Sequence, residues 1–224
     1  MGKQFTLTAA DKHRLGAYRA DPDGPAKGGI VVIQEIFGVN HHIRTVCDRL
    51  AKEGYAAVAP ALFDRMEPNF ECGYTPDEIA NARKFIANPD FGAMLRDAQA
   101  AIDELKQEGP VAILGFCMGG TISFLAAAEG TGLSAAVCLY GGHIIKIVDK
   151  MPKCPTQMHF GEKDASIQMS DVETIKKKHP ECEIFVYPDA GHGFCCDERG
   201  SYNEAACKLA WQRSMEFLKQ HVKK

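Results

Sequence analysis

Short apolar runs alternate along this chain with stretches that have the hydrophobic spacing of an amphipathic helix. Ile30–Ile33 and Val111–Leu114 are two such runs, and a strand without polar residues is typical of a parallel sheet buried on both faces. Residues 41–53, which lie between them, place their apolar side chains on one helical face, as Ile43, Val46, Cys47 and Leu50. The alternation predicts an α/β fold, a mostly parallel, doubly wound sheet flanked by helices on both faces.

The remaining elements follow from the same periodicities. We expect edge strands at residues 4–9 and 15–20, further strands at 55–59, 135–139, 156–160 and 183–187, and helices at 93–107, 119–128 and 203–220. Ser170 and Glu173 have the spacing of a capping box, which predicts a helix that ends near Lys178. Residues 64–76 are polar with Pro and Gly and are predicted to form a surface loop. The length of 224 residues suits one domain over residues 1–224.

Composition narrows the classes of partner. The formal net charge is −3, and no basic run favours nucleic acid or an anionic membrane as a partner. The sequence shows no signal peptide and no apolar span of bilayer length, so we expect a cytoplasmic protein. The nine cysteines lack the spacing of a disulfide framework, which favours free thiols in a reducing compartment. His41 and His42 are adjacent and diverge on a helix, so no metal site and no cofactor are expected.

The most informative motif is Gly115-Phe116-Cys117-Met118-Gly119, where a predicted strand turns sharply into a predicted helix. Gly-x-Cys-x-Gly is the pattern of a nucleophile elbow, with cysteine in place of the usual serine. The glycines remove side chains that would collide at a strained turn, and the helix N-terminus favours a thiolate. A phosphate-binding loop would require a lysine after its last glycine, and none follows here. A buried cysteine in a glycine-rich turn is the other alternative.

An elbow nucleophile requires an acid and then a histidine later in the chain. Asp164 follows the strand predicted at residues 156–160, and His192 follows the strand at 183–187, so both lie at the sheet edge where ligands bind. The order predicts a triad in which Cys117 attacks, His192 accepts its proton or stabilises its thiolate, and Asp164 orients the imidazole. The oxyanion is expected to bind the amides of Met118 and Ile36.

The chain resembles the dienelactone hydrolase family, which has the α/β-hydrolase fold, along nearly its whole length. The resemblance is carried by four segments: Gln34-Glu35-Ile36-Phe37-Gly38, Gly115-Phe116-Cys117-Met118-Gly119-Gly120, Gly191-His192-Gly193-Phe194, and Arg199 with Ser201, Tyr202, Ala206, Ala210 and Trp211. It implies hydrolysis of a small ester or lactone through an acyl-thiol intermediate, since family members open the ring of dienelactone to maleylacetate. It also implies that Glu35 contacts the resting thiol and releases it when substrate binds.

In the family, two arginines hold the substrate carboxylate. The resemblance places Arg65 in the first position, whereas the second, four residues after His192, is Cys196. Arg199 is displaced from that position by three residues and is therefore not assigned the role. The Cys196 thiol cannot replace a bidentate guanidinium contact. Tyr140 ends a strand and is a candidate to line the pocket. The sequence gives no indication of the oligomeric state.

This departure leaves other functions open. A thioesterase or a carboxylesterase for an uncharged substrate would use the same machinery. A thiol-based redox sensor or binding protein is also possible in principle, if oxidation linked Cys117 to Cys195 or Cys196. A non-catalytic scaffold is the remaining alternative, although the chain retains all three triad residues.

Overall fold

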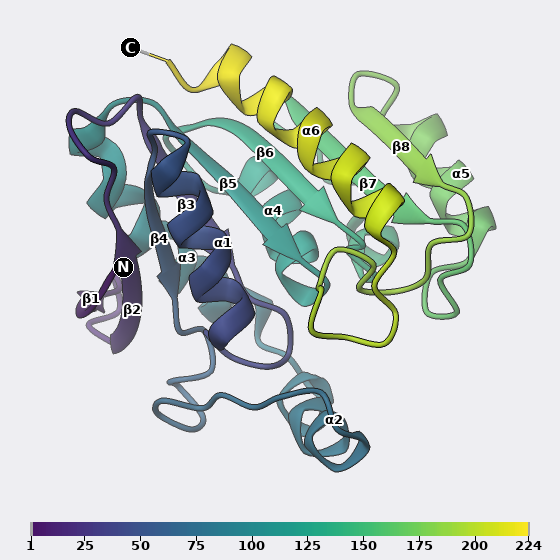
Figure 1. Ribbon diagram of the computed structural model, residues 1–224, viewed down its shortest axis with the longest axis horizontal. Helices are drawn as coiled ribbons and strands as arrows, with labels where there is room; N and C mark the ends of the chain where they lie inside the picture. The colour runs from purple at the N-terminus through teal and green to yellow at the C-terminus, as the bar shows by residue number, and fades with distance from the viewer. Residues whose placement is uncertain (1, 224) are drawn as a thin grey trace.

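The computed structural model describes residues 2–223 and contains one eight-stranded sheet, in the order β1-β2-β4-β3-β5-β6-β7-β8 (Figure 1). Strands β3 to β8 are parallel to one another, and β1 pairs antiparallel with β2, which pairs antiparallel with β4. The strands are β1 Lys3–Thr8, β2 Arg14–Ala20, β3 Gly29–Ile33, β4 Ala56–Pro60, β5 Val111–Phe116, β6 Leu133–Leu139, β7 Thr156–Gly161 and β8 Glu183–Tyr187. The predicted mostly parallel sheet of an α/β-hydrolase fold is confirmed.

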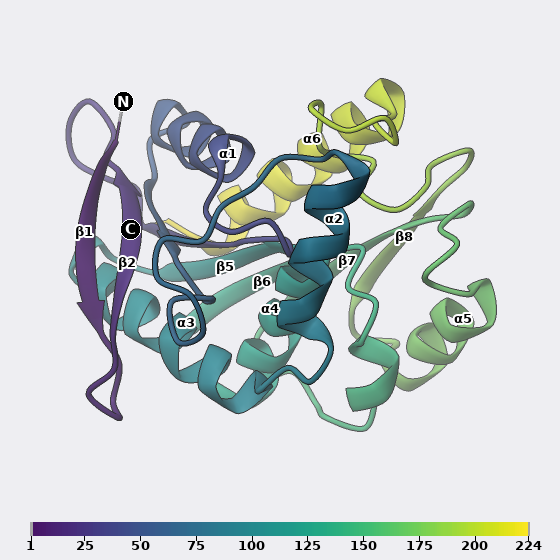
Figure 2. The same ribbon diagram turned by 90° about the horizontal axis from the view of Figure 1, so that it is seen from below.

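Helices cover both faces of this sheet (Figure 2). α1 and α6 pack on one face and α3 and α4 on the other, while α5 lies beside β8 at the far edge. The helices are α1 His41–Lys52, α2 Pro76–Ala82, α3 Phe91–Leu105, α4 Met118–Glu129, α5 Met169–Lys178 and α6 Glu204–His221, with 3-10 turns η1 Arg83–Ile86, η2 Lys106–Glu108 and η3 Ile144–Ile147. No helix among residues 2–223 is both long and apolar enough to cross a bilayer.

The central strands are apolar because both of their faces are covered. Every residue of β3, β4 and β5 is buried, so alternate side chains point into two separate hydrophobic layers. Val32 contributes to the layer under α1 and α6, and Val31 to the layer under α3 and α4. Burial on both faces fixes the register of each strand in the sheet, and therefore the position at which each strand ends at the carboxyl edge.

Two local predictions were wrong. The predicted edge strand 15–20 is interior, because β2 pairs on both sides and only β1 lies at that edge. The predicted capping box at Ser170 does not form, since α5 begins at Met169 and Ser170 lies inside it. The surface loop predicted at 64–76 is confirmed as far as Thr75, which forms a capping box with Glu78 at the start of α2. The Thr75-Pro76-Asp77-Glu78 sequence carried that signal.

Candidate active site

Cys117 stands at the turn between β5 and α4 in a strained conformation. Its φ is 55°, in the left-handed region that non-glycine residues rarely adopt, and its amide donates to the Leu139 carbonyl at 3.0 Å. A Cβ on Gly115 would lie 2.1 Å from the Gly119 carbonyl oxygen, and one on Gly119 would lie 2.4 Å from the Ile33 oxygen. The turn therefore requires both glycines and presents the thiol at the carboxyl edge of the sheet.

His192 connects the thiol to a buried carboxylate. Its Nε2 lies 3.0 Å from Cys117 Sγ, and its Nδ1 lies 2.7 Å from Asp164 Oδ2. The Asp164 side chain is fully buried, and its other oxygen accepts the Ser166 amide at 2.8 Å. Gly193 follows with φ 75°, so the loop after β8 turns back sharply beside the imidazole. The structure brings the three side chains predicted from the elbow and the chain order into one hydrogen-bonded line.

The charge state of this group depends on the thiol and the carboxylate. Burial by itself lowers the pKa of His192, because a buried imidazolium loses its hydration. The negative charge of Cys117, together with the hydrogen bonds that the ring donates to Asp164 and Cys117, outweighs burial and raises the pKa of His192 to about 10. At neutral pH the imidazole is therefore charged, and its Nε2 faces the sulfur at 3.0 Å.

Met118 and Ile36 lie beside the sulfur. Met118 is the first residue of α4, and Ile36 follows β3; both line the same cavity as Cys117. Neither amide donates a hydrogen bond to the part of the chain that the structure describes. These are the two residues whose amides were predicted to bind the oxyanion.

Glu35 lies next to the site but has a different partner from the one expected. Its side chain is only 2% exposed, and Oε1 accepts a hydrogen bond from Arg199 Nη1 at 2.9 Å. Arg199 also stacks over Phe37, with 5.3 Å between guanidinium and ring centre. The expected contact between Glu35 and the resting thiol is absent from residues 2–223 as described, where Cys117 Sγ is bonded to His192. Glu35 binds Arg199 rather than the thiol, because a buried carboxylate is stabilised more by a positively charged guanidinium than by a neutral donor.

The two predicted substrate-binding residues lie outside the cavity. Arg65 is held by Asp97, at 2.7 and 2.8 Å, and by Asp11 at 3.0 Å. The Asp97 side chain is fully buried, so Arg65 neutralises the Asp97 carboxylate under the β1–β2 hairpin and is not directed to the cavity. Tyr140 is fully buried behind the imidazole, with its ring centre 5.3 Å from that of His192. It supports the histidine from the core side and does not line the cavity.

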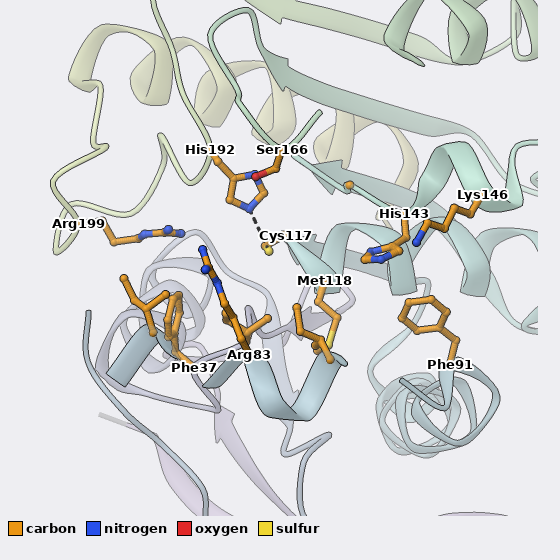
Figure 3. Close-up of a pocket in the computed structure, with 14 residues that line it drawn as sticks. Phe37, Arg83, Phe91, Cys117, Met118, His143, Lys146, Ser166, His192 and Arg199 are labelled. Atoms are coloured by element: carbon orange, nitrogen blue, oxygen red, sulfur yellow. Dashed lines mark hydrogen bonds between the residues drawn. The ribbon is translucent and has the colours of Figure 1, made fainter. Parts of the chain in front are cut away.

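The cavity above Cys117 has a volume of about 310 Å³ and is cationic (Figure 3). Arg83 and Arg199 lie on one side of the sulfur and Lys146 lies on the other. His143 lies beside Lys146 and is uncharged at neutral pH, because burial lowers its pKa. No acidic side chain is among the lining residues that the structure describes. The walls between these groups are apolar and consist of Ile36, Phe37, Ile79, Ile86, Phe91 and Met118. The space suits a small, partly apolar anion.

The sequence analysis did not identify Arg83, and it assigned no substrate-binding role to Arg199. Arg83 begins η1, directly after α2, and its guanidinium points toward the sulfur (Figure 3). The Thr75–Glu78 capping box could have predicted that a helix begins after residue 75. Ile79, Arg83 and Ile86 of this helical segment line the cavity. No local signal shows that Arg199 turns inward, because that depends on the buried Glu35 of a distant strand end.

All nine cysteines are free thiols. Cys195 faces Cys207 of α6, where each sulfur lies near the other residue's carbonyl oxygen, at 3.6 and 3.9 Å. The alternative in which oxidation links Cys117 to Cys195 would require Cys195 to leave these contacts.

Comparisons with known proteins agree with one another. Residues 15–222 match the model of the "Dienelactone hydrolase family". A "Putative carboxymethylenebutenolidase" from Synechocystis sp. is 39% identical over 94% of this chain and 93% of its own. A carboxymethylenebutenolidase from Pseudomonas putida is 31% identical over 96% and 94%. The crystal structure of a "Putative Dienelactone Hydrolase" from Klebsiella pneumoniae is 32% identical, covers 98% of this chain and 99% of its own, and has a TM-score of 0.84.

Proposed function

The chain belongs to the dienelactone hydrolase family and is a hydrolase that acts on esters; we propose that it cleaves small lactones or esters bearing a carboxylate, through an acyl-thiol intermediate on Cys117. The observation that carries the proposal is the line of Cys117, His192 and Asp164 at the floor of a cationic cavity. A thiol, a charged imidazole and a buried carboxylate in this order are the parts of a nucleophilic acyl transfer.

The first half-reaction forms the acyl enzyme. The Cys117 thiolate attacks the carbonyl carbon, and the carbonyl oxygen becomes an oxyanion facing the amides of Ile36 and Met118. When the tetrahedral intermediate collapses, the carbon–oxygen bond to the leaving group breaks and His192 gives its Nε2 proton to that oxygen. Each amide that bonds the oxyanion is expected to contribute about 3 kcal/mol, judged from the loss of comparable donors elsewhere.

The second half-reaction releases the product. His192, now neutral, accepts a proton from a water molecule that attacks the thioester carbon, and Cys117 leaves as a thiolate. Asp164 bonds Nδ1 throughout, so it keeps Nε2 aimed at the sulfur and stabilises the imidazolium on either side of the cycle. With a lactone, the leaving oxygen stays attached to the acyl group, and the ring-opened product departs only after this step.

The lining charges support the choice of an anionic substrate. Glu35 already neutralises much of the charge of Arg199, whereas Arg83 has no ion-pair partner among residues 2–223. A guanidinium that ends in an apolar-walled cavity is a strong site for a carboxylate, because it can form two parallel hydrogen bonds. Arg83 therefore takes the role that the sequence reading gave to Arg65.

The test compares cis-dienelactone with its neutral methyl ester on three proteins: the wild type, Cys117→Ala and Arg83→Gln. Cys117→Ala is expected to abolish turnover of both compounds. Arg83→Gln is expected to raise KM for the anion about 10- to 100-fold, the value of about 1.5–3 kcal/mol for a charged hydrogen bond, and to leave the neutral ester unchanged. An intact mass shift on Cys117 during turnover would identify the acyl enzyme.

Arg65→Gln is the matched control, because it removes an arginine outside the cavity and should leave both KM values unchanged. Turnover that survives Cys117→Ala would contradict the nucleophile. Equal losses for the anion and the neutral ester in Arg83→Gln would contradict the carboxylate site but not the triad.

A further inference from the structure

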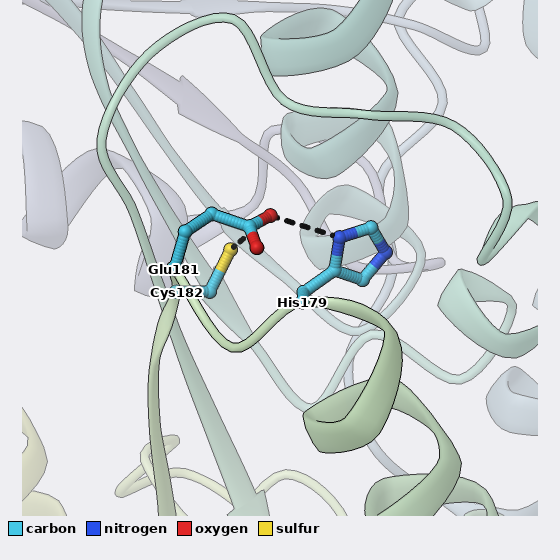
Figure 4. A group of neighbouring side chains, drawn as sticks. All are labelled: His179, Glu181 and Cys182. Atoms are coloured by element: carbon cyan, nitrogen blue, oxygen red, sulfur yellow. Dashed lines mark hydrogen bonds and ion pairs between the residues drawn. The ribbon is translucent and has the colours of Figure 1, made fainter.

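A second polar group lies far from the cavity, in the turn between α5 and β8. His179 follows the last residue of α5, and Glu181 and Cys182 precede the first residue of β8 (Figure 4). This turn is at the amino end of β8, whereas Cys117 lies at the carboxyl edge of the sheet. The mechanism above uses none of these three side chains, yet one nitrogen, one oxygen and one sulfur atom converge there within 4.8 Å of one another.

The surroundings of His179 fix its proton on one nitrogen. The ring is fully buried, and its Nε2 lies 2.8 Å from the carbonyl oxygen of Val148. A carbonyl oxygen can only accept, so Nε2 carries a hydrogen. The lone pair of Nδ1 in the neutral ring then faces Glu181 Oε1 at 3.1 Å, and two electron-rich atoms at that distance require a cation between them.

Cys182 makes this position suit a metal ion as well as a proton. Its sulfur lies 3.8 Å from Glu181 Oε1, and Figure 4 shows the sulfur and the imidazole on either side of the carboxylate. Around a tetrahedral Zn²⁺ with bonds of about 2.0–2.3 Å, neighbouring ligand atoms lie about 3.3–3.6 Å apart. The nitrogen–oxygen separation of 3.1 Å and the oxygen–sulfur separation of 3.8 Å bracket that range, and the nitrogen and the sulfur lie within 4.8 Å of each other. The Glu181 side chain is 45% exposed and is free to make the small adjustment.

We propose that His179, Glu181 and Cys182 form a binding site for a thiophilic divalent metal ion of the Zn²⁺ class, with water as the fourth ligand. The donor set of imidazole, carboxylate and thiolate is one that zinc prefers. The Nε2–H bond to Val148 is the contact that commonly orients a metal-binding histidine from behind. A bound ion would tie the end of α5 to the start of β8.

A second group of possible ligands, His42 with Asp197 and Glu198, lacks this support. His42 Nδ1 lies 3.7 Å from Asp197 Oδ1, but its buried Nε2 has no hydrogen-bond partner in the described chain. A metal-binding imidazole is normally held through its other nitrogen, and an unheld ring is a poor ligand. The α5–β8 turn is therefore the better site.

Metal binding at this turn displaces a proton. The Cys182 thiol gives its proton to water as the sulfur–metal bond forms, and no oxidation or reduction takes place. The nearby carboxylate and the incoming ion neutralise each other's charge, which favours exchange of the proton for the metal.

The experiment titrates Co²⁺, a spectroscopic substitute for Zn²⁺, into the Cys117→Ala protein, which removes the other thiol–imidazole pair. We expect one equivalent to bind with thiolate-to-cobalt charge-transfer absorption in the near ultraviolet. Cys182→Ser in this background should abolish that absorption and weaken Zn²⁺ binding at least tenfold, and Glu181→Gln should weaken it as well. Cys72→Ser, a half-buried thiol in the 64–76 segment, is the matched control and should change neither measurement.

Two outcomes would overturn the proposal. One is the absence of charge-transfer absorption at Co²⁺ concentrations above 1 equivalent, which would leave a proton as the cation and His179–Glu181 as a simple ion pair. The other is absorption that persists in Cys182→Ser. Ester hydrolysis gives an independent reading, since Cys182→Ser in the otherwise wild-type chain should hydrolyse substrate at the wild-type rate whether or not metal binds.

Discussion

Replacing Arg199 with methionine tests how far the loop after β8 depends on the buried ion pair with Glu35. The Glu35 side chain is 2% exposed and cannot reach bulk water without moving the chain, whereas Arg199 is 15% exposed and lines the cavity. Removing one partner of a buried pair typically costs about 3–5 kcal/mol, because the remaining charge has lost its hydration without compensation. Since Arg199 has some exposure, we expect Arg199→Met to lower the free energy of unfolding by about 3 kcal/mol.

A double-mutant cycle separates the ion pair from the other contacts of Arg199. Glu35→Gln leaves the guanidinium at the cavity water and should cost about 1 kcal/mol. The double variant should be about 2 kcal/mol more stable than the sum of the single losses predicts, because no unpaired charge remains. The packing of Arg199 over Phe37 is lost in both methionine variants and cancels in the cycle.

Urea unfolding followed by far-ultraviolet circular dichroism gives the four free energies. Arg83→Met is the control, because it removes an exposed arginine from the same cavity and should change stability by less than about 0.5 kcal/mol. Additivity of Glu35→Gln and Arg199→Met within about 0.5 kcal/mol would refute the reasoning, since it would mean that the two charges do not stabilise each other.

Three further predictions concern the triad and the elbow. The pKa of His192, about 10 in the wild type, should fall in Cys117→Ala, because burial then acts against Asp164 alone; a proton NMR titration of the ring measures it, and an unchanged value would contradict the assigned cause. Asp164→Asn should lower kcat about 10³- to 10⁴-fold with little change in KM, and a loss below tenfold in steady-state kinetics would exclude its orienting role. Gly115→Ala should unfold or inactivate the protein, because the added Cβ would lie 2.1 Å from the Gly119 carbonyl oxygen; wild-type melting temperature and activity would show that the elbow can relax.

The sheet was readable from sequence because its signals are local. A strand buried on both faces must be apolar at every residue, so Ile30–Ile33 and Val111–Leu114 can be recognised as strands without knowing which strands pair with them. The prediction of a capping box at Ser170 was wrong although the spacing was present, because α5 begins at Met169 and Ser170 therefore lies inside the helix. Boundaries depend on where tertiary packing lets a helix start, which a four-residue pattern does not record.

The sequence by itself determined the placement of Cys117, Asp164 and His192, because each follows a strand and parallel strands deliver their carboxyl ends to one edge. It did not determine which cations line the cavity. Arginine side chains are long, and their partners are selected by charges brought near in space: Arg65 is drawn to Asp97, 32 residues away, and Arg199 to Glu35, 164 residues away. Those carboxylates are buried by the packing of the whole domain, so the choice of guanidinium groups that line the cavity depends on the tertiary structure.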